Sequence, residues 1–521
     1  MKKNGTVLKK FLAVAVTAFI LGLSPYLWQT VPDDANFTAF IAKTLLVTWI
    51  LLKNYLPHII TIYIACAAAL IFFEERNPDR TILWLMTLVF LPVIGLILYT
   101  LLGPDLKRIK MRKLFVPAKP YPRIERLDWR NAPARVRKMS LLAFRNSCAE
   151  ICERVGVEIL VDGEATFASI KEELSKARRY VNIEYFIFKN DRLGGQIADI
   201  LAERSRAGVK VRLSVDGVGG RKFSRSLKKS LQDAGVEVKT FMPVSFPFLR
   251  SGLNFRNHRK IIVIDGDTAF TGGLNIGVEY LGEGPLGHWR DTHAIFRGDA
   301  VRALNAIFLS DWKISSGEDL SPDDPQFAPS KTGAQTDLPV TPTQIVPSGS
   351  ASAWRSIQQI FFLMIAEAQK RIWITSPYLA PDTAILEALK IAALSGVDTR
   401  LIIPEKGDHF LSYWAGMSNV EDLLRSGVRI WTYANGFIHA KTLIMDDAIA
   451  SVGTANLDNR SLAINFEVQA FIYDGKICSI LEEQFLKDFE DSNECLLPEW
   501  EKRGLGSKAL ESLGKLWSSQ V

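Results

Sequence analysis

The chain has few residues that could build a disulfide framework or a structural zinc site. It holds five cysteines in 521 residues, and none of them makes a C-x-x-C pair. A structural zinc site and a disulfide-stapled fold are therefore both poorly supported. The excess of one sign of charge over the other is also small, since the formal net charge is only +7 at pH 7. A modest basic excess suits a phosphate-bearing partner, either nucleic acid or an anionic membrane surface.

Charged residues are rare inside four apolar runs that follow one another near the start of the chain. The fourth run has no charge over 21 residues, which matches the roughly 20 residues that a membrane helix needs. No small-x-small cleavage site follows the first run, so we expect an uncleaved anchor. The second run holds Lys43 and is also compatible with a buried core helix. We predict two to four transmembrane helices among the runs 11–23, 37–52, 59–73 and 82–102.

A basic cluster just past the fourth run sets the expected orientation. It consists of Lys107, Arg108, Lys110, Arg112 and Lys113. Lys and Arg are enriched on the cytoplasmic side of membrane helices, so we expect everything after Gly103 to lie in the cytoplasm. The runs also decide between the two anionic partners, because a protein acting on soluble DNA would not need them. We predict a membrane partner and no nucleic acid.

Beyond the basic cluster, strand-like and helix-like periodicity alternate, and the same order occurs twice. The first copy predicts strands at 157–161, 180–188 and 209–215, with helices at 167–179 and 195–207. The second predicts strands at 343–346, 371–375 and 399–403, with helices at 353–368 and 383–394. We predict an α/β fold with five divisions. They are 1–113, a transmembrane region with its basic juxtamembrane segment; 114–156, a connector with a helix around 132–155; 157–315, a first lobe; 316–342, a linker rich in Pro, Ser, Asp and Gly; and 343–521, a second lobe with a C-terminal helix.

One spacing of five residue types occurs in each copy. The first motif comprises His258, Lys260, Asp265, Gly272 and Asn275, and the second comprises His439, Lys441, Asp446, Gly453 and Asn456, at identical offsets. A fixed position matches by chance roughly 1 time in 20, so two such matches are not accidental. We infer a duplicated lobe in which each copy brings one His and one Lys to a shared site.

The residue types of the two motifs are those of a phosphate-binding catalytic site. Residues i and i+2 of a strand share a face, so His and Lys of each motif should point the same way. The lysines would neutralise phosphate oxygens, while Asn275 and Asn456 donate to them and Gly272 and Gly453 allow the main chain to approach closely. Two histidines suggest that one attacks phosphorus and the other moves a proton, with no metal or cofactor required.

Four carboxylates accompany the two motifs. Asp265 and Asp446 complete the motifs and are counted with the catalytic residues, although their positions at strand ends are typical of turns. A nucleophilic imidazole also needs its second nitrogen held, usually by a carboxylate. Asp291 and Glu467 stand at matching places in the two copies, and we predict that they orient His258 and His439.

The duplicated H-x-K-x(4)-D-x(6)-G-x(2)-N motif resembles the signature of the phospholipase D superfamily. Within it, the chain is similar to the bacterial cardiolipin synthases in residues 257–260, 272–275, 289–293 and 456–467, and in the N-terminal segments 75–80, 90–95 and 99–103. The resemblance covers roughly residues 157–490 and implies two α-β-α sandwich lobes after N-terminal transmembrane helices. It also implies a bacterial inner-membrane enzyme, with cytoplasmic lobes, that moves a phosphatidyl group between two phosphatidylglycerol molecules and releases glycerol. His258 would be the nucleophile and His439 the general acid and base.

Two other functions fit parts of the same pattern. A membrane-bound phospholipase D-type hydrolase would use the same site with water as the acceptor, and the sequence does not separate it from a transferase. A degenerate, scaffold-like membrane protein is disfavoured because neither motif lacks a residue.

Overall fold

The computed structural model describes residues 78–91 and 132–518 except 244–254, 331–338 and 351, together with scattered positions between 49 and 98. The chain forms two compact units, Met1–Gly103 and Pro104–Val521. In the first unit, α3 (Pro78–Phe90) is an apolar helix of 13 residues that overlaps the fourth predicted span. Within the described residues, every helix is too short or too polar to cross a bilayer. Most of the four apolar runs lies outside the described residues, so the number of spans stays a prediction.

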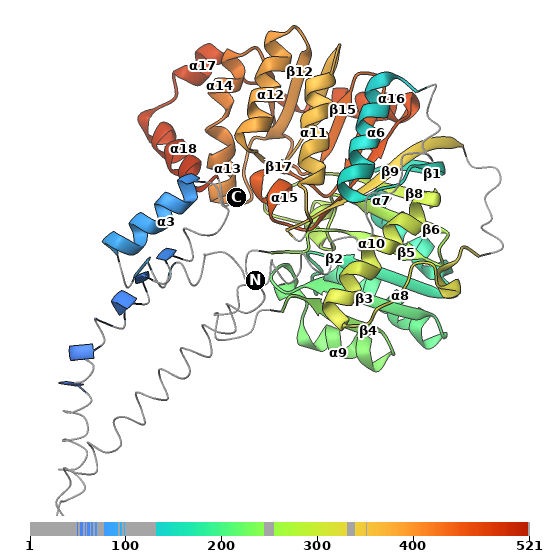
Figure 1. Ribbon diagram of the computed structural model, residues 1–521. Helices are drawn as coiled ribbons and strands as arrows, with labels where there is room; N and C mark the ends of the chain where they lie inside the picture. The colour runs from blue at the N-terminus through green and yellow to red at the C-terminus, as the bar shows by residue number, and fades with distance from the viewer. Residues whose placement is uncertain are drawn as a thin grey trace, which may run out of the picture. The chain divides into compact units, whose positions relative to one another are not determined.

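The unit Pro104–Val521 is organised around one 15-stranded sheet (Figure 1). Counted outward from its centre, the first half contributes β1-β8-β6-β5-β2-β3-β4 and the second contributes β9-β18-β16-β15-β10-β12-β13, followed by β19. The strands of the first half are β1 (Cys152–Val161), β2 (Tyr180–Tyr185), β3 (Lys210–Asp216), β4 (Glu237–Phe241), β5 (Ile261–Ile264), β6 (Thr268–Gly272) and β8 (Thr292–Gly298). Those of the second are β9 (Val340–Ser348), β10 (Arg371–Thr375), β12 (Asp398–Pro404), β13 (Arg429–Tyr433), β15 (Thr442–Met445), β16 (Ile449–Gly453), β18 (Glu467–Ile472) and β19 (Ser492–Glu494). The two halves therefore repeat one topology, and they join where β1 pairs antiparallel with β9.

Helices cover both faces of this sheet, which makes a three-layer α/β arrangement. The strand β5 shows why: Ile262 and Ile264 belong to one apolar core, whereas Ile261 and Val263 belong to another. Alternate side chains of a strand point to opposite faces, so each face has its own core. The first-half core is closed by α7 (Asp162–Lys176), α8 (Arg192–Arg206) and α9 (Arg225–Asp233); the second-half core by α6 (Ala134–Ser147), α11 (Ser356–Glu367), α12 (Thr383–Leu394) and α14 (Val420–Arg425); and the opposite-face core, which spans both halves, by α10 (Asp299–Ser316) and α16 (Gly475–Glu490).

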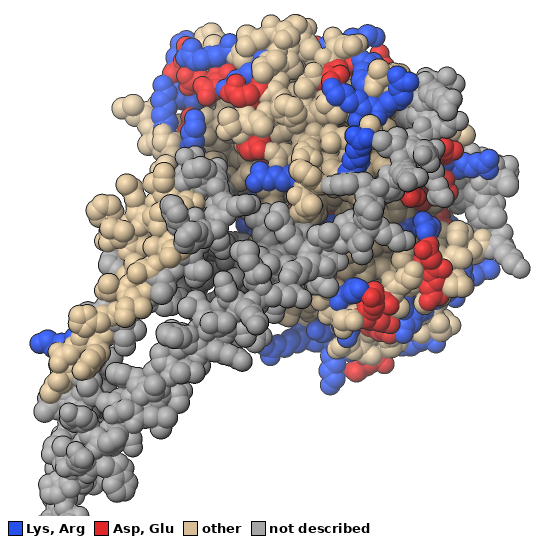
Figure 2. Space-filling model, viewed as in Figure 1, with Lys and Arg blue, Asp and Glu red and all other residues tan. Residues whose placement is uncertain are grey.

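The surface of this unit carries charges of both signs. Figure 2 shows Lys and Arg interspersed with Asp and Glu over the visible face. The described basic residues are therefore not gathered into one patch on that face.

The joint between the halves corrects two predicted boundaries. The connector helix was expected around 132–155, but α6 ends at Ser147 and β1 already begins at Cys152. A strand was expected at 343–346, yet β9 begins at Val340 and ends at Ser348. Both strands are longer than expected because they pair with each other at the centre of the sheet, a partnership that is not local in sequence. The division into two lobes and a linker otherwise stays a prediction.

Candidate active site

Each His-x-Lys segment is bonded to the main chain of the other half. The two-residue strand β14 (Phe437–Ile438) runs parallel to β7 (Trp289–Arg290), and His439 N–H donates to the Arg290 carbonyl at 2.7 Å. The counterpart is a bridge between Asn257 and Phe466, beside which His258 N–H donates to the Phe466 carbonyl at 2.9 Å. Each motif histidine therefore lies beside the residue that comes next in the chain after the carbonyl it contacts. For His439 this residue is Asp291, and for His258 it is Glu467.

Those next residues are the two predicted orienting carboxylates. His258 Nδ1 lies 3.0 Å from Glu467 Oε2, and His439 Nδ1 lies 2.7 Å from Asp291 Oδ2. The pairing crosses between the halves, a feature that their matching positions in the sequence did not reveal. All four side chains are buried. Because a carboxylate contacts Nδ1 of each ring, Nε2 is the nitrogen left to meet a substrate.

The two motif lysines are buried beside the histidines. Lys260 Nζ donates to the His258 carbonyl at 2.7 Å, and Lys441 Nζ donates to the His439 carbonyl. Lys441 Nζ also lies 2.8 Å from His439 Nδ1, a contact that His258 does not share among the described residues. Burial lowers the pKa of Lys260 to about 7 and that of Lys441 to about 8. The His-x-Lys segments were expected on strands, but they lie just before β5 and β15.

The pKa of each motif histidine is affected by charges from both motifs. Burial lowers the pKa of His258, and the charges of Lys260 and Lys441 lower it further against the opposing effect of Glu467. Burial likewise lowers the pKa of His439 well below its ordinary value, and Lys441, Lys260 and His258 act in the same direction. The charge of each motif lysine therefore lowers the pKa of the histidine in the other motif as well as in its own. Both imidazoles are neutral near pH 7.

The two orienting carboxylates differ in their surroundings. Thr454 Oγ1 donates to Glu467 Oε2 at 2.6 Å, and the pKa of Glu467 is lowered because His258, Lys260 and this hydroxyl outweigh burial. The corresponding residue of the first half is Gly273, where an added Cβ would lie 2.0 Å from Asp291 Oδ1. Burial raises the pKa of Asp291. The ionised form is therefore favoured at Glu467 and disfavoured at Asp291.

Asp265 and Asp446 do not face the histidines, and this corrects their inclusion among the catalytic residues. Each follows the far end of its motif strand with a positive φ, 55° and 52°. Asp265 accepts the main-chain N–H groups of residues 178, 179 and 180, each at 2.8 Å. Asp446 accepts those of residues 369, 370 and 371, together with the side chain of Arg135. The two aspartates thus hold the starts of β2 and β10 against β5 and β15.

The motif glycines and asparagines were predicted to bind phosphate, and the structure shows other contacts for most of them. A Cβ at Gly272 would lie 2.5 Å from His293, and one at Gly453 would lie 2.4 Å from Gln469, so close strand packing requires both glycines. Asn275 donates to Tyr280 Oη at 2.6 Å and accepts from the main chain of residue 187 at 3.2 Å. Asn456 differs, because its buried Oδ1 has no partner in the described part of the chain.

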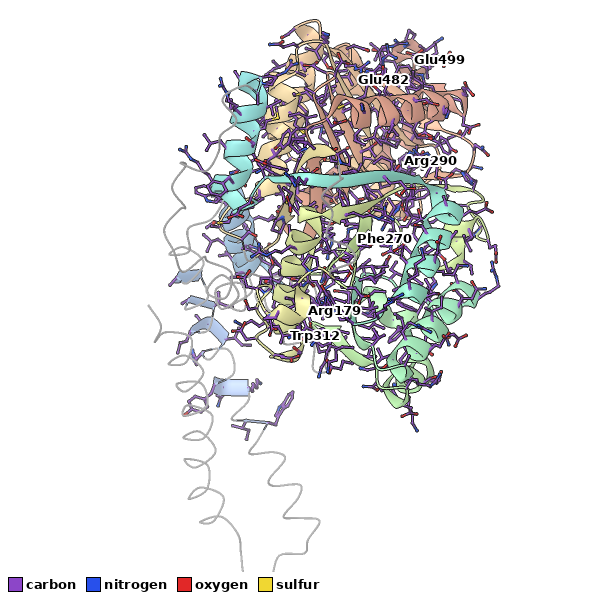
Figure 3. The ribbon with its side chains drawn as sticks, turned by 90° about the vertical axis from the view of Figure 1, so that its right-hand side faces the viewer. Arg179, Phe270, Arg290, Trp312, Glu482 and Glu499 are labelled. Atoms are coloured by element: carbon purple, nitrogen blue, oxygen red, sulfur yellow. The ribbon has the colours of Figure 1, made fainter. Side chains whose placement is uncertain are left out.

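Two arginines were missed by sequence reasoning. Arg259, between the motif His and Lys, donates to Asp311, to the Glu467 carbonyl at 3.0 Å and to the Ser348 carbonyl at 3.1 Å. Arg290, labelled in Figure 3, donates to Asp488 at 2.7 Å and to the carbonyl of Asp291. Both arginines belong to the first half and donate to residues of the second half, so they join the two halves. Their place immediately next to motif residues was the available signal.

The comparisons with known proteins agree with this geometry. Residues 170–312 and 362–489 match the family described as cardiolipin synthase, PLD-like domain, and residues 61–104 match the phospholipase D-nuclease N-terminal family. A cardiolipin synthase of Halalkalibacterium halodurans is 41% identical over 471 residues, which cover 88% of this chain and 92% of the relative. Cardiolipin synthase 2 of Bacillus anthracis is 40% identical over 457 residues, covering 86% and 88%.

A solved structure shares the fold. Phosphatidylserine synthase of Haemophilus influenzae aligns with 74% of this chain and 100% of its own at a TM-score of 0.56 and 15% identity. That level of identity speaks for the fold alone, whereas the sequence relatives span nearly the whole chain at about 40% identity. The resemblance drawn from the twin motifs is confirmed: the chain belongs to the cardiolipin synthase family of the phospholipase D superfamily.

Proposed function

We propose that this protein makes cardiolipin by transferring a phosphatidyl group from one phosphatidylglycerol to another, with release of glycerol. The observation that carries this proposal is the pair of crossed contacts His258–Glu467 and His439–Asp291, at 3.0 and 2.7 Å. They hold two imidazoles by Nδ1 and leave each Nε2 to meet the substrate, and a buried lysine donates to the main-chain carbonyl of each histidine. A nucleophile and a proton carrier are what a phosphodiester exchange requires.

In the first step, Nε2 of His258 attacks phosphorus and the bond from phosphorus to the glycerol oxygen breaks. His439 gives its proton to the departing oxygen, so glycerol leaves as the neutral alcohol. In the second step, His439 takes the proton of the acceptor hydroxyl, whose oxygen attacks phosphorus as the phosphorus–nitrogen bond breaks. The sum is two phosphatidylglycerols giving cardiolipin and glycerol, with no oxidant, reductant or cofactor.

The lysines and the substrate charge adjust the two histidines for these roles. An anionic phosphodiester between Lys260 and Lys441 favours their ammonium forms, because opposite charges stabilise one another most in a desolvated site. The same negative charge opposes the lysine effects that lower the pKa of His439. Substrate binding therefore promotes the protonated imidazole that the departing glycerol needs.

The assignment of His258 as the nucleophile is supported by the difference between the carboxylates. An ionised carboxylate on Nδ1–H makes Nε2 more nucleophilic and stabilises the positive ring that forms on attack. Glu467 Oε2 accepts a hydrogen bond from the Thr454 hydroxyl at 2.6 Å, which favours its ionised form, whereas Gly273 stands at the corresponding place beside Asp291. His439 is then the general acid and base. The two lysines would contact the phosphate, without a metal.

The same proposal places the enzyme in the bacterial inner membrane. The apolar runs of the first 103 residues would anchor it as a multi-pass protein, and the basic cluster 107–113 would keep the catalytic halves on the cytoplasmic side. The match of residues 61–104 to the N-terminal family supports a shared anchoring region. Anionic phospholipid would thus reach the site from the membrane that holds the protein.

Incubation of the purified full-length protein with phosphatidylglycerol tests this proposal. Cardiolipin and glycerol in equal amounts are the expected products, and His258→Ala and His439→Ala should each abolish them without preventing membrane insertion. Phosphatidic acid as the main lipid product would instead indicate the hydrolase, with water as the acceptor. An unchanged rate in either variant would refute a site shared by the two histidines.

A further inference from the structure

The sheet edge beside His439 carries a tyrosine–carboxylate pair that the mechanism does not use. Tyr378 Oη lies 2.8 and 2.9 Å from the two carboxylate oxygens of Asp408. Tyr378 follows β10 and Asp408 follows β12, and these strands are parallel neighbours. The carboxyl end of β10 also pairs with Thr442, three residues after His439. The tyrosine–carboxylate pair and His439 therefore lie at the same end of the strands, where β10 and β12 finish.

Asp408 is close enough to the reacting groups for its charge to act on them. It raises the pKa of His439 and of Lys441, although burial lowers both pKa values overall. Its side chain is 17% exposed. Its one described ion pair is with the exposed ring of His409, at 3.6 Å. Asp408 is thus a carboxylate that solvent, and hence a ligand, can reach next to the general base.

A third oxygen lies on the neighbouring short strand. Tyr378 immediately precedes β11 (Leu379–Ala380), which pairs in parallel with β17 (Leu457–Asp458), and Asn456 immediately precedes β17. Tyr378 and Asn456 therefore hold equivalent places on adjacent strands. Asn456 Oδ1 is buried without a hydrogen-bond partner among the described residues. A buried acceptor of this kind points to a donor that the described residues do not supply.

The described residues of the first half do not form an equivalent set of oxygens. Its equivalent of Tyr378 is Ile187, which precedes the bridge between Phe188 and Ile276. The amide of Asn275 is already engaged by Ile187 N–H and by Tyr280 Oη. The loop after β3 carries Arg221 and Lys222 where the loop after β12 carries Asp408. The oxygens are thus confined to the side of His439, which deprotonates the acceptor.

The chemistry of these three oxygens selects a hydroxyl-bearing ligand. A carboxylate at the edge of a phosphate site repels an anionic diester, so it does not serve the phosphate itself. A hydroxyl group, in contrast, donates a strong hydrogen bond to a carboxylate, and Tyr378 gives its one O–H to Asp408 and so holds that carboxylate in place. We infer that Asp408, held in place by Tyr378 and with Asn456 Oδ1 as a second acceptor, accepts the hydrogen bond of the hydroxyl next to the attacking hydroxyl of the acceptor, so that the site selects a vicinal diol such as the glycerol headgroup. This inference rests on the proposed phosphatidyl transfer.

Competition between two soluble acceptors that differ by one hydroxyl tests the inference. The full-length protein in detergent micelles receives phosphatidylglycerol with equal concentrations of 1,2-propanediol and 1-propanol. In each transfer the phosphorus–oxygen bond to glycerol breaks, a bond to the new alcohol forms, and the alcohol proton ends on glycerol. The measured quantity is the ratio of phosphatidylpropanediol to phosphatidylpropanol by mass spectrometry. This ratio does not depend on how much enzyme is folded or on the titration of His439 and Lys441.

The wild type should favour the diol, and Asp408→Ala should lower the ratio about tenfold, the usual effect of losing a hydrogen bond to a charged group. Tyr378→Phe should lower it by a smaller factor, and it decides the test if Asp408→Ala makes too little product. The matched control is Glu405→Gln, an exposed carboxylate of the same loop whose side chain contacts Asn493; its ratio should equal that of the wild type.

Two results would overturn the inference, and they are distinguishable. The first is an identical product ratio in the wild type, Asp408→Ala and Tyr378→Phe, with transfer still taking place. It would show that these residues do not bind the second hydroxyl of the acceptor, while the proposed transferase activity would stand. Formation of phosphatidic acid alone by the wild type, with neither alcohol used, would remove both the transferase and the acceptor subsite.

Discussion

At the scale of single residues, each motif histidine contacts a carboxylate from the other half of the chain, and we propose that catalysis depends on these contacts. Glu467 and His258 are 209 residues apart in sequence, and Asp291 and His439 are 148 apart. The residue types and their duplicate spacing predicted that Asp291 and Glu467 would serve the histidines. Nothing local in the sequence could say which carboxylate serves which ring, because that follows from the two crossed main-chain pairs.

Substitution of Glu467 by glutamine should preserve the shape of the site and remove the charge behind His258. We expect the rate of cardiolipin formation to fall by about 10²–10⁴, as amide substitutions behind a catalytic histidine do. The measurement is the initial rate with phosphatidylglycerol, and the control is Glu483→Gln, an exposed carboxylate paired with Lys487. A rate within twofold of the wild type would show that the His258–Glu467 contact does not contribute to catalysis.

The buried lysine of the first motif should destabilise the fold at neutral and acidic pH. The pKa of Lys260 is about 7 in the folded protein against an ordinary value of 10.5. Between these values the unfolded chain binds the proton and the folded chain does not, so the stability contributed by this group rises with pH across that window. Below pH 7 the penalty is fully present, and each tenfold loss of proton affinity on folding contributes about 1.4 kcal/mol to it.

Lys260→Met should therefore raise the unfolding temperature more at pH 6 than at pH 9, while cardiolipin formation is lost. Thermal unfolding of both proteins at the two pH values measures this difference. An equal effect of the substitution at pH 6 and pH 9 would contradict a lowered pKa for Lys260.

At the scale of elements, local periodicity predicted much of the fold. The strand 371–375 and the helix 383–394 coincide with β10 and α12, because their patterns are set by neighbouring residues. The start of β1 was missed because its pairing with β9 joins segments nearly 190 residues apart. The two-residue strands β7 and β14 carry too little pattern to be predicted, although they place His439 beside Asp291.

The motif aspartates belong to this scale, since they join strand ends. Asp265→Ala would leave three buried or half-buried N–H groups at the start of β2 without their acceptor. We expect the free energy of unfolding to fall by roughly 2–4 kcal/mol, with the rate at a permissive temperature nearly unchanged. Asp233→Ala, at the exposed end of α9, is the control for a lost surface carboxylate. A hundredfold loss of rate at unchanged stability would restore a catalytic role for Asp265.

At the scale of the whole molecule, two copies of one topology close a site that neither copy could form alone. The central β1–β9 pair, the crossed contacts of the histidines and the bonds of Arg259 and Arg290 all join the halves. Duplication in the sequence predicted this shared site. The copies differ at Thr454 against Gly273 and at Tyr378 against Ile187, and these pairs can be recognised only once the strands are aligned in space. We propose that these differences give the two histidines unequal roles.

The most direct test of the proposed mechanism traps the phosphatidyl group on the enzyme. His439→Ala is mixed with a phosphatidyl ester of p-nitrophenol, whose leaving group departs without a proton, and the protein is analysed by intact mass and peptide mapping. The mechanism predicts one phosphatidyl adduct per chain, located on His258 and absent from the double variant that also carries His258→Ala. An adduct on another residue, or release of p-nitrophenol with no adduct at His258, would contradict it.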